Sequence, residues 1–193
     1  TLVIMPVIKP VPFDNLVGVG AIVEVIQQII IGVAIGFISM MVLNTFVLAG
    51  QIVAMQTGLG FASIVDPVNG INVPAVGQFY LILATLLFWT LDGHLAMIQM
   101  ITTSFDAFPI GEAWWTAAQF RDIAEWGSWM FVSAVTLSLA PIVSLLIVNL
   151  AFGVMTKAAP QLNIFSIGFS IAQITGLIII WVTLENFVSH FAT

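Results

Sequence analysis

Hydrophobic residues fill four long stretches of the chain in which no side chain is charged. The first stretch lies between Glu24 and Asp66, and the others lie between residues 66 and 92, 125 and 157, and 157 and 185. Each is longer than the roughly 20 apolar residues needed to cross a hydrocarbon core about 30 Å thick. The pattern therefore predicts an all-α, polytopic integral membrane protein of long helices and helical hairpins.

Turn-forming residues divide the chain into the elements that we expect. Three proline-containing pairs indicate a lead-in loop at 1–15, because proline disfavours helix at and before its own position. Helical blocks are predicted at about 16–56, 75–101, 128–152 and 164–190, with a loop at 57–74, all within one domain spanning 1–193. A straight helix over the first block would be about 60 Å long, twice a bilayer. That block is therefore bent, divided into two passes, or extends beyond the lipid.

Composition narrows the class of protein further. The 193 residues are 61% hydrophobic and 6% charged, whereas soluble domains have about 25% charged residues. The formal net charge of −6 argues against nucleic acid as a partner, because such binding needs Lys and Arg. Cys is absent, and no nucleotide-binding loop or catalytic constellation is present. We accordingly predict no enzyme activity and no catalytic, metal or cofactor site.

Small residues mark one face of the first block. Gly32 and Gly36 are four residues apart, a spacing that lets two helix backbones approach closely in a membrane. Glu24, Gln28 and Ser39 continue the same slowly drifting face. We interpret this face as a helix–helix packing surface, with a polar pathway as the alternative.

The loop at 57–74 combines apolar side chains with glycine. Gly58, Leu59, Gly60, Phe61 and Ala62 come first, and turn chemistry follows at Asp66-Pro67 and Asn69-Gly70. Non-helical backbone at membrane depth is tolerated only where protein buries it or where it lines a cavity. The segment fits either an apolar gate that fills a pore or a loop packed on neighbouring helices, and composition does not choose between them.

Polar residues within the later blocks are few. Asp92 and His94 flank Gly93 in the second block, and Asn149 lies in the third. Ionisable groups at membrane depth commonly serve ion or proton pathways, so Asp92 and His94 suit the coupling site of a small-molecule or ion secondary transporter. Alternatively, Gly93 marks a helix end and Asp92 caps the turn that follows.

Several spaced segments, in the same order, resemble the FliR family of flagellar and type III secretion export-gate proteins. They are Gln56–Ala62, Val65-Asp66-Pro67, Val73-Pro74, Asp92-Gly93-His94, Asn149–Gly153 and Ala159–Phe165. The resemblance covers roughly residues 16–190. Family members carry further hydrophobic helices before the first block and a short tail after the last, and we expect this chain to lack both.

The resemblance implies a function that composition does not give. It implies a core subunit of the flagellar export gate in the bacterial inner membrane, at the basal body. FliP-like and FliQ-like subunits would join it in a helical hetero-oligomer, with an FlhB-like subunit nearby, membrane lipid around it and unfolded flagellar proteins as substrates. The same resemblance assigns Gly58–Ala62 to a plug that closes the channel.

Overall fold

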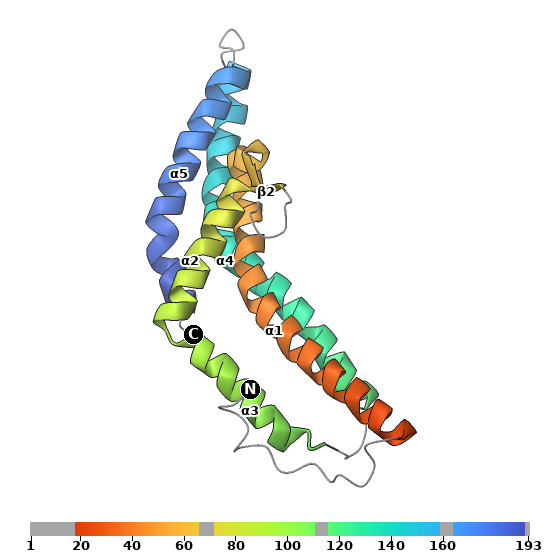
Figure 1. The fold of residues 1–193 in the computed structure, drawn as a ribbon. Helices are drawn as coiled ribbons and strands as arrows, with labels where there is room; N and C mark the ends of the chain where they lie inside the picture. Colours follow the sequence, from red (N-terminus) through yellow and green to blue (C-terminus); the bar gives the residue numbers. More distant parts are fainter. Residues whose placement is uncertain (1–17, 66–71, 111–115, 159–163, 192–193) are drawn as a thin grey trace. The chain divides into compact units, whose positions relative to one another are not determined.

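The computed structural model describes residues 18–65, 72–110, 116–158 and 164–191. Two predictions fall outside these residues, namely the lead-in loop at 1–15 and the turn at Asp66-Pro67 and Asn69-Gly70. Five α-helices account for most of the described chain (Figure 1). They are α1 (Val19–Thr57), α2 (Ala75–Thr90), α3 (Gly93–Ala107), α4 (Ala117–Ala158) and α5 (Ile164–Phe191).

A short non-helical segment separates α1 from α2. It contains the 3-10 helix η2 (Leu59–Phe61) and the strands β1 (Ser63–Val65) and β2 (Asn72–Pro74). The strands pair antiparallel, with Ser63 opposite Pro74 and Val65 opposite Asn72. The predicted loop thus contains a three-residue ladder, while the all-α class is confirmed.

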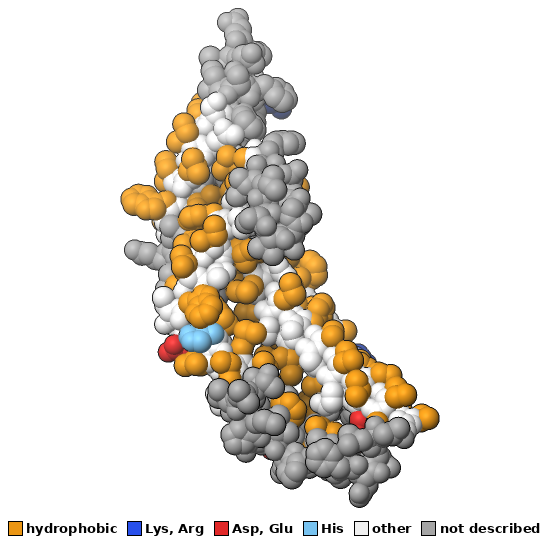
Figure 2. All heavy atoms as spheres, viewed as in Figure 1, with side chains coloured by type: hydrophobic (Ala, Val, Ile, Leu, Met, Phe, Trp, Pro, Cys, Tyr) orange, Lys and Arg blue, Asp and Glu red, His pale blue; other side chains and the backbone are white. Residues whose placement is uncertain are grey.

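Length and apolar composition place this chain in a membrane. Among the described residues, α1 and α4 are each long and apolar enough to span a bilayer, and α2 with α3, bent by 71° at their junction, forms either a third, broken span or a re-entrant loop. Large hydrophobic side chains are exposed along every helix, and they cover much of the surface in Figure 2. Soluble monomers rarely expose continuous apolar patches of this kind, so lipid or other subunits must cover them.

The helix boundaries differ from the sequence predictions in the second and third blocks. The first block, for which the sequence left a bend, a division and an extension beyond the lipid open, is one continuous helix, α1, with glycines 32, 36 and 50 inside it. The second block is interrupted at Asp92, whose backbone is left-handed with φ 56°. The third block begins earlier than residue 128, at Ala117, because Thr116 N–H donates to the Gln119 side chain at 2.7 Å. A Gln side chain that accepts the backbone N–H of the residue three positions before it is one half of the capping box found at helix starts.

The chain divides into two compact units. One comprises Thr1–Val42 and Phe88–Ser128, and the other comprises Leu43–Leu87 and Trp129–Thr193. The second unit contains a hydrophobic core shared by the end of α1, by α2 and by α5. Its buried members are Phe46, Val53, Ala54, Val76, Tyr80, Ala84 and Ile180.

Two glycines bring α1 and α2 together in the second unit. A Cβ built on Gly50 would lie 2.8 Å from the Cα of Gly77 and 3.0 Å from the Val76 carbonyl oxygen. Contacts this short involve backbone, which has no rotamer by which to move away. Small-residue packing of the kind found between membrane helices is therefore present inside the chain at Gly50 and Gly77, whereas the sequence predicted it at Gly32 and Gly36.

Candidate functional site

The segment predicted as a gate begins with a sharp change of backbone direction at the end of α1. Gly58 adopts φ 75° and ψ 1°, in the left-handed region. Glycine enters this region at little cost because it has no Cβ. One 3-10 turn follows, closed by the Ala62 N–H donating to the Leu59 carbonyl at 3.0 Å. Gly58 therefore converts a membrane-length helix into a compact turn.

The far end of the segment is tied back to its beginning. The Ala75 N–H donates to the Ala62 carbonyl at 2.8 Å, and the β1–β2 ladder lies beside this bond. The close approach of Gly50 and Gly77 also holds the C-terminal part of α1 against the first turn of α2. The backbone of residues 58–65 is consequently fixed at both ends.

The two glycines of the segment have different roles. Gly58 is the only glycine with positive φ among the described residues. A Cβ on Gly60 would meet its nearest atom, the Met55 Cα, at 3.6 Å, which is ordinary contact. Both glycines belong to the segment that the sequence predicted as a gate or a packed loop, but only Gly58 uses the conformational freedom of glycine here.

Side chains of the segment divide between the core and the surface. Leu59 is partly buried and packs against the core of the second unit, whereas Ala62 is exposed. Thr57, at the end of α1, is fully buried. Its hydroxyl donates to the Ala54 carbonyl at 3.0 Å and accepts the Leu59 N–H at 3.4 Å. Apart from its position before Gly58, no sequence pattern indicated this role of Thr57.

Gly32 and Gly36 lie in the first unit, on an exposed face of α1. A Cβ added to either would meet no atom of the described residues within 4 Å. Ile29, Val33 and Met40 are exposed beside them. One turn earlier, the Gln28 Nε2 is buried without a hydrogen-bond partner in the described chain. The predicted packing face at Gly32 and Gly36 is therefore unoccupied by the described residues.

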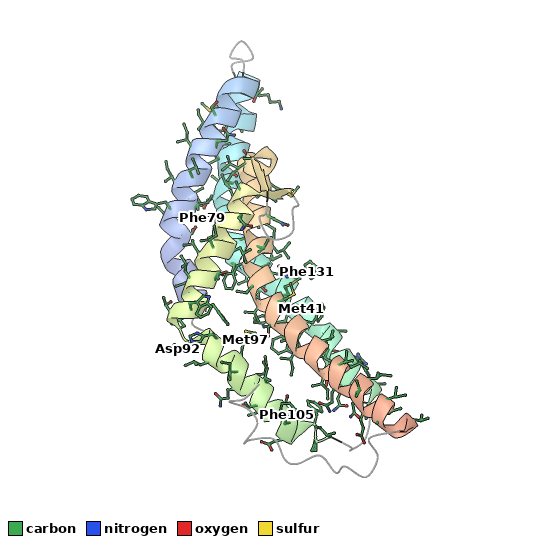
Figure 3. All side chains as sticks on the ribbon, in the orientation of Figure 1. Met41, Phe79, Asp92, Met97, Phe105 and Phe131 are labelled. Atoms are coloured by element: carbon green, nitrogen blue, oxygen red, sulfur yellow. The ribbon has the colours of Figure 1, made fainter. Side chains whose placement is uncertain are left out.

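Asp92 lies at the turn between α2 and α3 (Figure 3). It occupies the N-cap position of α3, but its exposed carboxylate makes no capping hydrogen bond. The prediction that Asp92 caps this turn through its side chain is therefore wrong. Instead, Gly93 makes room for an aromatic ring, because a Cβ there would overlap the ring of Phe88.

His94 stacks on Trp89, with ring centroids 4.8 Å apart and 28° between the planes. The His94 Nδ1 is buried and has no partner in the described structure. Nothing in the described residues joins Asp92 to His94 by a hydrogen bond or ion pair; the one ion pair found there is exposed, between Arg121 and Glu125. Asn149 lies on an exposed face of α4.

A pocket of about 390 Å³ lies within the first unit, between α1, α3 and α4. The hydroxyls of Thr103 and Ser104, in its lining, donate to carbonyls of their own helix. Ligand pockets usually present a few convergent polar groups that fix the ligand's orientation. In this pocket the Thr103 and Ser104 hydroxyls are already used within α3. Over the described residues, no three His, Asp or Glu side chains are grouped to hold a metal ion.

The architecture defines an α-helical polytopic membrane protein with a fixed non-helical turn between two apolar helices. Over residues 1–193 the sequence matches the family described as bacterial export proteins, family 1. It is 37% identical over 177 residues to the flagellar biosynthetic protein FliR of Pectobacterium carotovorum subsp. carotovorum, covering 92% of this chain and 67% of that protein. The chain belongs to this family of bacterial export proteins.

Other relatives extend the comparison to a second kind of system. FliR of Escherichia coli K12 is 38% identical over 152 residues, which cover 79% of this chain and 58% of that protein. The surface presentation of antigens protein SpaR of Shigella flexneri is 25% identical over 158 residues, 81% of this chain and 60% of the relative. The chain thus spans 58–67% of the length of these three relatives.

Proposed function

We propose that this chain is a core subunit of the flagellar type III export gate. In this proposal it forms, with FliP-like and FliQ-like subunits, the channel through which unfolded flagellar proteins leave the cytoplasm. The gate lies in the bacterial inner membrane at the basal body, beside an FlhB-like subunit. Support comes from family membership and from the identity to flagellar relatives, which exceeds that to the SpaR protein.

The turn after α1 is the observation that carries this proposal. Irregular backbone inside the hydrocarbon region is tolerated only where protein surrounds it or where it lines a cavity, and the proposal places this turn at that depth. Here the break is built with a left-handed Gly58, a 3-10 turn and a strand ladder. Such a fixed, apolar turn suits a plug that other subunits enclose.

Within the proposed plug, the residues 58–62 do two jobs. Leu59 anchors the turn through its packing on the core, and Gly58 sets the backbone direction. Ala62 is exposed and contributes to the surface that closes the channel. Apolar constrictions exclude water and with it ions, so the closed gate would hold the membrane potential before export begins.

The face of α1 with Gly32 and Gly36 is proposed as the contact with a FliP-like neighbour. Two exposed glycines, with no described atom within 4 Å of an added Cβ, permit a second helix to approach closely.

The mass of the purified complex tests this function. Expressed with its FliP-like and FliQ-like subunits and isolated in mild detergent, the tagged chain is expected in a particle of many times its own 20.8 kDa. Native mass spectrometry would identify each subunit in it. A stable monomer or homodimer under these conditions would contradict the proposal and favour a transporter that works alone.

A further inference from the structure

Thr57 connects the proposed plug to the helix before it. Its hydroxyl bonds both the last turn of α1, at Ala54, and the first residue of η2, at Leu59. The side chain is completely buried. Any movement of Thr57 would therefore change the position at which the turn leaves α1.

Gly176 of α5 receives this buried side chain. A Cβ built on Gly176 would lie 2.7 Å from the Cβ of Thr57 and closer still to its Cγ2 methyl group, while the Thr57 Cα would be 3.7 Å away. The first two distances exclude any residue larger than glycine unless Thr57 moves. Thr57 and Gly176 lie in the same compact unit, and both are buried.

The face of α5 that contains Gly176 also contacts the helix after the plug. Ala172, Gly176 and Ile180 recur every four residues, and each is buried, so they share one face. Thr183 follows on that face and shares a side-chain hydrogen bond with Tyr80 of α2. One face of α5 therefore contacts α1 at the start of the plug segment and α2 beyond its end.

We infer that Thr57 is a positioning residue for the plug and that Gly176 on α5 is its receptor. While α5 holds Thr57, the glycine turn is fixed in the closed position. Displacement of α5 frees the Thr57 side chain, and the turn that it caps moves with it. This inference rests on the proposed plug function, and it adds the helix whose movement would control the plug.

A double-mutant cycle in the assembled complex tests the contact. Hydrogen exchange of the 58–62 amides is measured by mass spectrometry, because these amides report local opening. Gly176→Ala is expected to speed their exchange about tenfold or more, as overpacking of a rigid contact does. Thr57→Gly removes both clashing atoms, so Gly176→Ala should have little further effect in the Thr57→Gly background.

Matched variants separate this contact from general damage. Gly153→Ala, at an exposed glycine of α4 where an added Cβ meets no described atom within 4 Å, should leave exchange unchanged. Thr57→Ser keeps the capping hydroxyl but removes Cγ2, so it should reduce the effect of Gly176→Ala without abolishing it. If Gly176→Ala alone fails to assemble, recovery of the complex with Thr57→Gly supports the contact, and no recovery overturns it.

Ion leakage is measured on the same complexes. It distinguishes the proposed contact between Thr57 and Gly176 from the proposed plug function of residues 58–62. Faster exchange at 58–62 in the Gly176→Ala complex supports the contact even if the membrane stays tight, in which case the plug function fails. Equal exchange in the Gly176→Ala and unaltered complexes overturns the contact, whatever the leakage. Additive effects of the two substitutions in the cycle would also overturn it.

Discussion

Deletion of residues 58–62 is expected to make the assembled gate permeable to small ions. The deletion removes the left-handed Gly58, the 3-10 turn and the exposed Ala62 that together build the proposed plug. A constriction that excludes water presents a barrier, and each roughly 1.4 kcal/mol taken from that barrier raises passage tenfold. We expect a conductance at least about tenfold above that of the unaltered complex, measured in planar bilayers or by ion-sensitive dyes in vesicles.

Two single glycine substitutions are expected to give smaller effects on ion conductance than the deletion does. Gly58→Ala places a Cβ at φ 75°, which costs about 1–2 kcal/mol, so it should loosen the turn and produce a smaller leak. Gly60→Ala has room for its Cβ and no unusual backbone angle, so it should stay tight. The complex must be shown to assemble in each case. Full assembly of the deletion variant with no ion passage would rule out the plug.

The double substitution Gly32→Leu and Gly36→Leu is expected to abolish co-purification with a FliP-like subunit. Both glycines are exposed with open space around them in the described chain, so leucine does not disturb the fold there. Leucine also favours helix over glycine by roughly 1 kcal/mol per residue. A leucine side chain would, however, prevent the close approach of a second helix backbone. The measurement is the amount of partner recovered with a tag on this chain.

Gly20→Leu is the matched control on the same helix. Gly20 is exposed and open like the other two, but it lies roughly 120° around the helix from Gly32 at about 100° per residue. Its substitution should leave partner recovery unchanged. Gly50→Leu should instead unfold the chain itself, because its Cβ meets the backbone of Gly77. Normal recovery with the double variant would move the partner contact to another face.

The charge pattern was sufficient to predict helices and membrane class, because a bilayer restricts what an apolar chain can form. It left open whether the first block bends, and α1 proves continuous over 39 residues. Glycine inside a helix costs roughly 1 kcal/mol, which the packing at Gly50 and Gly77 offsets. Similarly, Pro141 lies inside α4 without ending it, as neighbouring helices allow in membrane proteins.

Local backbone and side-chain contacts explain the helix boundaries that the hydrophobic pattern missed. The interruption of the second block depends on Asp92 in a left-handed conformation and on the Phe88 ring above Gly93. A hydrophobic pattern does not indicate which glycine an aromatic ring will cover. The capping by Gln119 that begins α4 is local, and a search for Thr or Ser three residues before Gln or Glu would have found it.

The candidate site was predictable in its location but not in its construction. Gly58–Ala62 stands out in the sequence because glycine and apolar residues alternate between helices. The different roles of Gly58 and Gly60 depend on backbone angles and neighbours, which composition does not contain. The contact between Thr57 and Gly176 joins residues far apart in the chain, so the hydrophobic periodicity of the sequence does not predict it. Asp92 and His94 were close in sequence, yet the structure does not join them.

Cross-linking from position 62 tests most directly whether other subunits enclose the turn after α1. The chain contains no Cys, and Ala62 is exposed in the chain alone, so Ala62→Cys provides a single reactive site. With a short thiol-reactive photo-cross-linker in the intact complex, the expected product joins this chain to a FliP-like subunit. Rapid labelling by a water-soluble maleimide in that complex, with no product to another subunit, would contradict the account.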